Sequence, residues 1–174
     1  MSSPIAIEQI QYRKVKTADV ELFKALRLKA FRTDPDVFVS TFEEEKNFPL
    51  EKFSDLLDKN YVLGAFDGIR LIGTLMYMEQ EKQKFRHIGI LGGMYVDPGC
   101  RNLGIGRKLV SIMLQNLQRL DHLQALQLKV ITTNLTAIRL YESFGFSSWA
   151  CERNALQHDG RFFDQHHMAL ALRS

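Results

Sequence analysis

The sequence predicts a domain of the α/β (α+β) class, in which helices flank a mixed, mostly antiparallel central sheet with one parallel strand pair. Two hairpins support the antiparallel part: Asp67-Gly68 lies between two apolar segments, and His158-Asp159-Gly160 lies between the last two. Over residues 88–130 an apolar segment, a short loop, an amphipathic helix and a second apolar segment follow one another. A strand–helix–strand unit of this kind places its two strands parallel.

The first sixty residues predict one strand and two helices. Residues 11–16 form a short strand, and Thr17 is expected to cap the helix that follows. Apolar residues at roughly helical spacing carry that helix to Phe31. Residues 33–49 show no regular pattern and predict an irregular segment, whereas residues 50–58 predict a second short helix.

From residue 61 on, the pattern predicts strands and helices joined by short turns. One apolar stripe with a period of three to four residues predicts a helix over 105–120. A later helix over 134–144 is expected to end at Gly145. The expected strands are 61–66, 69–78, 88–96, 126–130, 146–156 and 161–172.

Length and composition limit the class of protein. The 174 residues predict a single domain over 1–174, and 45% hydrophobic and 25% charged residues are ordinary for a globular protein. No apolar segment approaches the roughly 18 residues that span a bilayer, so no membrane partner is expected. A net charge of +3, with scattered basic residues, gives no support for nucleic-acid binding. The two cysteines form no framework, which favours a cytoplasmic location.

A glycine-rich loop follows the long strand and opens the helix after it. Arg101, Gly104 and Gly106 lie in this loop, in the segment YVDPGCRNLGIGRKL. The first backbone N–H groups of a helix lack partners and carry the positive end of its dipole, so an anion can bind there. The sequence therefore predicts a pyrophosphate site, and the alternative is a loop whose glycines only allow close helix–sheet packing. A Walker loop and a dinucleotide fingerprint are both excluded, because Gly106 is followed by Arg107, Lys108 and Leu109.

A second pattern, TNxxAxxLYxxFGF, begins at Thr133. Asn134 and Tyr141 are seven residues apart, so on a helix both project from nearly the same face. Asn134 lies at the expected helix start, where its amide could cap the helix or reach a ligand. Such a ligand would lie at the carboxyl ends of the two parallel strands, where they diverge.

With these two segments in order, the chain resembles the GNAT superfamily of acyl-CoA-dependent N-acyltransferases, over residues 10–172. The resemblance implies a GNAT-like fold and an acetyl-CoA-dependent N-acetyltransferase that uses no metal. Its acceptor would be a primary amine of a small molecule, an amino acid or a peptide, attacking acetyl-CoA directly in a ternary complex.

The resemblance also implies roles for single residues. Backbone groups of residues 94–96 would bind the pantetheine arm like an added strand, and the loop N–H groups would hold the pyrophosphate. Asn134 would hydrogen-bond the cofactor, and Tyr141 would be the general acid that protonates the departing thiolate. The implied cofactor-binding residues are Met94, Tyr95, Val96, Arg101, Asn102, Leu103, Gly104, Ile105, Gly106, Arg107, Asn134 and Ala137.

The resemblance assigns no residue as the general base, because this chain has Ile90 at the position where some family members carry a glutamate. Glu43, Glu44 and Glu45 are candidates for the base or for an acidic acceptor wall, interleaved with phenylalanines; the alternative is a solvated face. His87 is a further candidate. The histidines near the C-terminus do not form a metal site, because the adjacent pair His166-His167 would face opposite sides of a strand.

Two other functions stay open at this point. The chain could be a non-catalytic acyl-CoA-binding regulatory module, or an α/β domain without a CoA site. The presence of Tyr141 favours the enzyme, because a binding module needs no positioned acid. A homodimer through the C-terminal strands is a further hypothesis.

Overall fold

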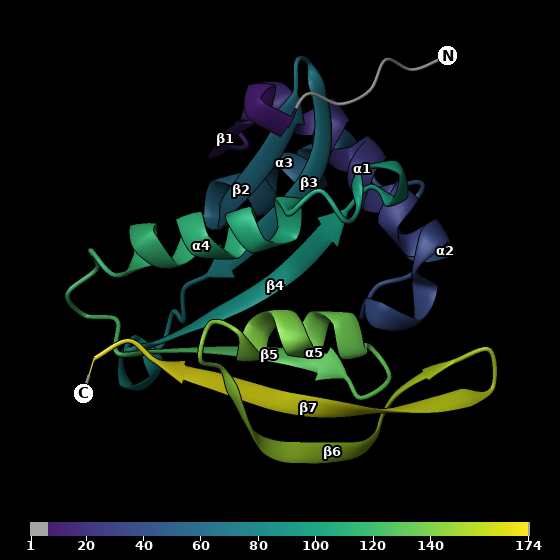
Figure 1. The fold of residues 1–174 in the computed structure, drawn as a ribbon. Helices are drawn as coiled ribbons and strands as arrows, with labels where there is room; N and C mark the ends of the chain where they lie inside the picture. The colour runs from purple at the N-terminus through teal and green to yellow at the C-terminus, as the bar shows by residue number, and fades with distance from the viewer. Residues whose placement is uncertain (1–6, 174) are drawn as a thin grey trace.

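A computed structural model describes residues 7–173, and one seven-stranded sheet runs through it (Figure 1). The strand order is β1-β2-β3-β4-β5-β7-β6. Every neighbouring pair is antiparallel except β4 and β5, which are parallel, so the predicted fold class is confirmed. The strands are β1 Gln11–Lys14, β2 Tyr61–Asp67, β3 Arg70–Met78, β4 Ile88–Val96, β5 Ala125–Ile131, β6 Ser147–His158 and β7 Arg161–Ala171.

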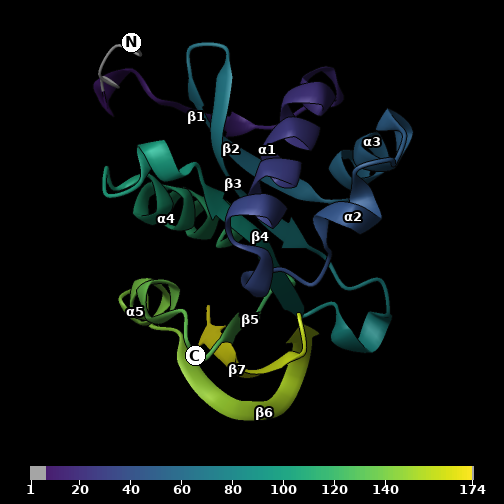
Figure 2. The same cartoon turned by 90° about the vertical axis from the view of Figure 1, so that its right-hand side faces the viewer.

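Helices cover both faces of the sheet. In Figure 2, α1, α2 and α3 lie on one side of it, and α4 and α5 lie on the other. The first group is α1 Val20–Thr33, α2 Phe42–Glu45 and α3 Leu50–Lys59. The second group is α4 Ile105–Leu117 and α5 Leu135–Glu142. Short 3₁₀ turns lie at Ile7–Gln9, Thr17–Asp19, Pro35–Val37, Gln83–Phe85 and Pro98–Cys100.

Two hydrophobic cores hold these layers together. One contains the apolar stripe of α4, including the fully buried Leu109 and Met113. The other contains Phe53 of α3 and Phe66 of β2. Neighbouring residues of β2 contribute to different cores, which explains why the strand has an unbroken apolar sequence rather than an alternating one.

The sheet opens at its parallel pair. Strands β4 and β5 are paired only over residues 88–90 of β4, which lie opposite 125–127 of β5. Beyond Ile90, β4 stays paired with β3 but not with β5, and Gly93 takes a left-handed conformation (φ 58°) at an irregularity in the β3–β4 register. A crevice is therefore expected at the carboxyl ends of the two strands, as the sequence indicated.

Two expectations for the N-terminal third need correction. Thr17 does not cap α1: it begins a 3₁₀ turn, and Asp19 occupies the N-cap position. The carboxylate of Asp19 accepts the N–H of Lys16 at 2.9 Å and two N–H groups of Arg13 in β1 at 2.6 and 2.8 Å. The segment 33–49 is not irregular throughout, because it contains the 3₁₀ turn 35–37 and the short helix α2.

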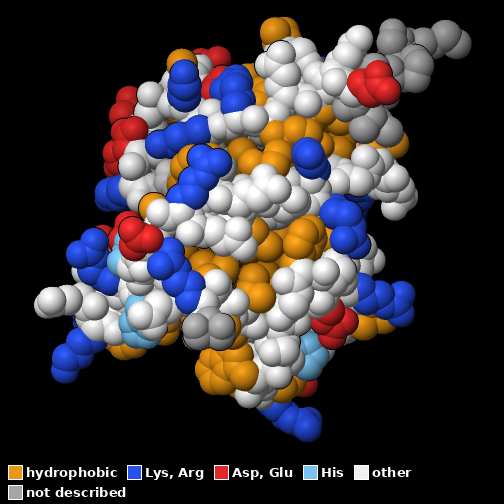
Figure 3. Space-filling view, turned by 60° about the vertical axis from the view of Figure 1, so that its left-hand side comes forward, with side chains coloured by type: hydrophobic (Ala, Val, Ile, Leu, Met, Phe, Trp, Pro, Cys, Tyr) orange, Lys and Arg blue, Asp and Glu red, His pale blue; other side chains and the backbone are white. Residues whose placement is uncertain are grey.

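One face of the molecule shows how its surface charge is distributed. Figure 3 brings forward the side that carries the carboxyl-terminal end of α4, and hydrophobic side chains gather near the middle of this face. Lysine and arginine side chains are spread around them and do not form a continuous stripe. No described helix is long and apolar enough to cross a membrane.

Candidate functional site

A groove of about 510 Å³ lies at the opening of the sheet, a size typical of small-molecule sites. Its walls come from the end of β4, the loop 97–104, the first turns of α4 and α5, and the segment after α1. The lining residues are Asp34, Val37, Phe38, Met94, Tyr95, Val96, Cys100, Arg101, Asn102, Gly104, Ile105, Gly106, Arg107, Asn134, Thr136, Ala137 and Leu140.

The glycine-rich loop begins α4 with its N–H groups directed outward. Gly104 is the N-cap residue and has a left-handed conformation (φ 77°) that favours glycine. The first backbone hydrogen bond of the helix runs from the N–H of Lys108 to the carbonyl of Gly104, at 3.0 Å. The N–H groups of residues 105–107 thus precede the first helical bond, as an anion site requires.

Gly106 lies in the floor of the groove. A Cβ at this position would lie 3.6 Å from the side chains of both Leu140 and Met94, and 3.9 Å from that of Val96. All three neighbours line the groove, so a side chain at position 106 would fill it. These contacts are of ordinary length, which means that the glycine keeps space for a ligand and does not relieve a clash within the protein.

Arg101 is fixed at the mouth of the groove. Its Nε donates to the carbonyl of Val96 at 3.0 Å, and its Nη2 donates to the carboxylate of Asp34 at 2.6 Å. The hydrogen bond that Arg101 donates to Asp34 raises the pKa of the guanidinium above its ordinary value. A permanent positive charge therefore lies beside the loop.

Asn134 lies at the start of α5, where its side chain caps the helix, one of the two roles expected from the sequence. Its Oδ1 accepts a hydrogen bond from the N–H of Ala137 at 3.1 Å and caps the helix. Asn134 and Ala137 also line the groove. The capping bond uses the amide oxygen, so the Nδ2 group is the part of Asn134 suited to a ligand.

Tyr141 and Leu103 are not among the described residues that line the groove. Tyr141 is 5% exposed, and its ring packs edge-on against Phe146 with the centroids 5.6 Å apart. Burial raises the pKa of its phenol above the ordinary value. Leu103 packs against the α4 core. The other eleven predicted cofactor-binding residues, Asn134 among them, all line the groove.

The three glutamates 43–45 do not form one wall, and none of them lines the groove. Glu43 is 73% exposed and pairs with Lys46. Glu44 accepts the N–H of Thr41 at 2.7 Å in a capping box that starts α2. Glu45 is 5% exposed and forms a bidentate pair with Arg27, with both contacts at 2.7 Å.

The pair of Glu45 and Arg27 decides what Glu45 can do. Burial raises the pKa of the Glu45 carboxyl, but the hydrogen bonds and charge of Arg27, with a hydrogen bond from Ser40, outweigh it. The net pKa lies below the ordinary value. A carboxylate held ionised in this way is a weak base for an amine proton.

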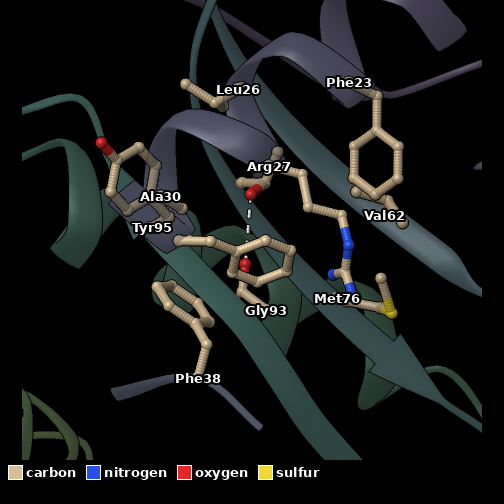
Figure 4. A pocket seen from close by; sticks show the side chains of 11 residues that line it. Phe23, Leu26, Arg27, Ala30, Phe38, Val62, Met76, Gly93 and Tyr95 are labelled. Carbon is tan, nitrogen blue, oxygen red and sulfur yellow. Dashed lines mark hydrogen bonds between the residues drawn. The ribbon is translucent and has the colours of Figure 1, made fainter. Parts of the chain in front are cut away.

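A second, much smaller cavity of about 20 Å³ lies between α1 and the sheet (Figure 4). Arg27 extends from α1 along this cavity toward Met76, and Phe23 lies beside it. The Oγ1 of Thr74 donates to the carbonyl of Gly93 at 3.1 Å and ties β3 to the irregular turn of β4. Phe38 and Tyr95 line both the groove and this cavity, so aromatic rings separate the two.

The remaining candidates lie apart from the groove. His87 is exposed at the start of β4, the opposite end from residues 94–96. His158 pairs with Asp36 at 2.8 Å, and His166 and His167 contact Ser148 and Glu152 separately. Within residues 7–173 no group of three His, Cys, Asp or Glu side chains is arranged to hold a metal ion.

Several groove residues were missed by the sequence analysis: Asp34, Val37, Cys100, Thr136 and Leu140. Asp34 and Val37 lie in a segment without periodicity; the packing of α1 on β3 and the contact of Thr33 with Tyr95 bring that segment to the site. Thr136 and Leu140 flank the predicted Ala137 on α5. Their helical spacing of one and three residues from Ala137 was the available signal.

The split sheet and the loop at its mouth define a class: an α/β protein with a groove beside a helix N-terminus whose first N–H groups lack helical partners. The model of the acetyltransferase (GNAT) family matches residues 23–146, which is most of the chain. The chain therefore belongs to the acetyltransferase (GNAT) family, and acetyl-CoA is the co-substrate that this membership indicates.

Individual relatives agree with this assignment. The chain is 30% identical over 156 residues to mycothiol acetyltransferase of Acidothermus cellulolyticus, covering 83% of this chain but only 47% of that relative. It is 21% identical to the L-amino acid N-acetyltransferase AaaT of Escherichia coli, over 94% of this chain and 98% of the relative. The fold matches yncA of Salmonella typhimurium, solved with its cofactor acetyl-CoA, with a TM-score of 0.83, 19% identity and 95% of each chain covered.

Proposed function

We propose that this chain transfers the acetyl group of acetyl-CoA to a primary amine of a small molecule, an amino acid or a peptide. Transfer occurs by direct attack in a ternary complex within one catalytic domain. The observation that carries the proposal is the groove: a stretch of β4 that is not paired with β5, an open floor at Gly106 and a helix N-terminus meet in one space.

The groove fits acetyl-CoA part by part. The backbone of residues 94–96 lies beyond the paired part of β4 and β5, so it can bond the amides of the pantetheine arm as a neighbouring strand would. The N–H groups of residues 105–107 and the guanidinium of Arg101 meet the pyrophosphate. Asn134 bonds the cofactor through its Nδ2 group. Arg107, which also lines the groove, supplies a further positive charge.

The chemistry requires a neutral amine, a site for the oxyanion and an acid for the thiolate. An alkylamine has a pKa of about 10, so it loses a proton before attack. An N–H group near Tyr95 or Val96 stabilises the developing oxyanion. Tyr141 protonates the thiolate: its raised pKa keeps the phenol protonated at working pH, and it lies one helical turn beyond Ala137.

None of the candidate bases that the sequence offered lines the groove, so we propose a different acceptor for the proton of the amine. Ile90 cannot take a proton, and the carboxylate of Glu45 is bound by Arg27. Among the described residues that line the groove, Asp34 carries the sole carboxylate, and it is paired with Arg101. The amine therefore loses its proton to water at the groove mouth.

An amino-acid acceptor is supported by the relative that is named an L-amino acid N-acetyltransferase and that matches this chain over nearly its full length. The aromatic boundary of Phe38 and Tyr95 suits an acceptor with an apolar body next to its amine. The alternative of a non-catalytic binding module has no specific observation in its favour.

An acetyl-transfer screen tests the proposal. The protein is incubated with acetyl-CoA and with L-amino acids, polyamines, aminoglycosides or short peptides, and the release of free thiol is measured. We expect thiol release above the rate without acceptor for at least one class of primary amine. Stabilisation by acetyl-CoA in a thermal-shift titration without transfer to any acceptor would instead support a binding module.

A further inference from the structure

We propose that the last two turns of α1 are a positioning device for the cofactor loop, with Lys29, Thr33 and Asp34 as its positioning residues. The inference rests on the proposed function, because it assigns these residues to acetyl-CoA recognition through groups that they contact. Neither the glycine-rich loop nor the α5 segment contains them, and they reach the loop from more than sixty residues away in the chain.

Thr33, Asp34, Arg101 and Tyr95 form a closed network between α1, the loop and β4. The Oγ1 of Thr33 donates to the carboxylate of Asp34 at 2.7 Å, and the same carboxylate oxygen accepts Arg101 at 2.6 Å. The Oγ1 of Thr33 also lies 2.9 Å from the hydroxyl of Tyr95. Arg101 returns to β4 through its bond to the carbonyl of Val96 at 3.0 Å.

The direction of each hydrogen bond in this network is determined. An ionised carboxylate only accepts, so Thr33 must give its single proton to Asp34. The hydroxyl of Tyr95 must then donate to Thr33, because Thr33 has no second proton. Without the hydroxyl of Thr33, Asp34 loses one of its two donors, and the mostly buried hydroxyl of Tyr95 loses its acceptor.

Lys29 provides a second attachment one helical turn earlier. Its Nζ contacts the carboxylate of Asp97 at 2.6 Å, and Asp97 is 8% exposed. The other oxygen of Asp97 accepts the N–H of Gly99 at 3.1 Å and caps the 3₁₀ turn Pro98–Cys100. Burial raises the pKa of Asp97, but Lys29 and the N–H of Gly99 outweigh it, so the carboxylate stays ionised.

The two attachments hold both ends of the stretch 97–101, directly before the helix N-terminus. A loop that is ordered before the ligand arrives loses less conformational entropy on binding, which strengthens binding without any new ligand contact. Arg101 gains most, because its long side chain would otherwise occupy many rotamers. Thr33 and Asp34 therefore act on acetyl-CoA through Arg101, and Lys29 acts through Asp97.

The test compares Thr33→Val, which keeps the shape of the side chain and removes the hydroxyl, with Thr33→Ser, which restores it. Thr74→Val is the matched control, because the Thr74 hydroxyl also donates in a partly buried position but contacts Gly93 and not the loop. Dissociation constants are measured by NMR titration for acetyl-CoA and for S-acetylpantetheine, which lacks the diphosphate.

We expect Thr33→Val to raise the dissociation constant for acetyl-CoA about three- to tenfold, which is the effect of one lost hydrogen bond. S-acetylpantetheine binding should stay within twofold, and Thr33→Ser and Thr74→Val should behave as the parent. Equal weakening of both ligands, or no rescue by serine, would overturn the positioning role. If acetyl-CoA stabilises the parent and Thr33→Val alike, only this role fails, whereas failure to stabilise the parent at all rejects the proposed function.

Discussion

Replacing Gly106 by alanine should raise the stability of the protein while it weakens acetyl-CoA binding. The position lies in the first turn of α4, and its backbone does not need the left-handed region, so alanine fits the conformation. The added methyl group meets its neighbours at 3.6 and 3.9 Å, which is ordinary contact. Removing a helical glycine stabilises a protein by roughly 0.5–1 kcal/mol, or about 1–4 °C in Tm for a chain of this length.

The same methyl group occupies the floor of the groove, where the proposed pyrophosphate must approach the backbone. If it displaces one charge-assisted hydrogen bond, about 1.5–3 kcal/mol of binding free energy is lost, a factor of roughly 10–100. Isothermal titration with acetyl-CoA measures the affinity, and thermal unfolding without ligand measures the stability. Gln115→Ala, on the exposed face of α4, is the control for a stabilised helix with an unchanged groove.

The two effects have opposite signs, so misfolding cannot produce them together. Affinity within twofold of the parent would show that the diphosphate does not lie over Gly106. A variant that is less stable than the parent would show that the first turn of α4 does not have the geometry described here.

Three further predictions concern side chains near the groove. Tyr141→Phe should lower kcat, measured by thiol release, about 10²-fold or more and leave acetyl-CoA affinity nearly unchanged; a kcat within twofold of the parent would reject the acid role. Because burial raises the pKa of this phenol, the activity of the parent should not fall through ionisation of Tyr141 below pH 10. Of the three glutamates, only Glu45→Gln should change the acceptor KM. Its partner Arg27 lines the small cavity, which shares Phe38 and Tyr95 with the groove where the acceptor is proposed to bind; an equal change in Glu43→Gln would contradict this. The pKa of Glu45 is lowered in the folded state, so its contribution to the free energy of unfolding is present above the unfolded pKa of about 4.3 and is lost as the pH falls through the folded value. The free energy of unfolding should therefore fall less steeply from pH 7 to 3 in Glu45→Gln than in the parent, and parallel curves would refute this.

Much of the fold could be predicted because its signals are local. The apolar stripe of α4, the turn Asp67-Gly68 and the alternation in β5 each determine one element without reference to the rest. Where prediction failed, a competing contact decided the outcome. Asp19, and not Thr17, lies at the N-cap of α1: its carboxylate accepts the N–H of Lys16 and the guanidinium of Arg13, so Thr17 begins a 3₁₀ turn instead. The start of α2 does have a local signal, the capping pair Thr41 and Glu44, but Glu44 also belongs to an acidic run that obscures it.

The site divides in the same way. The position of the loop and of the start of α5 at the groove could be predicted, because a glycine-rich helix start and a helix N-cap are local patterns. Asp34 and Val37 could not, since the packing of α1 on β3 brings their irregular segment to the groove. Glu43, Glu44 and Glu45 are adjacent in sequence but have three different environments, because a one-turn helix points successive side chains in different directions.

Because β4 and β5 are paired over only a short stretch, the sheet consists of two parts with few hydrogen bonds between them. Strands β1–β4 form one unit and β5–β7 the other, and three residue pairs connect them along the sheet. A ligand that bonds to the free edge of β4 and contacts α5 would act as a brace between the units and limit their relative twisting. Hydrogen exchange would detect this stiffening: amides that face the opening in residues 91–96 of β4 and 128–131 of β5 should exchange more slowly once acetyl-CoA is bound.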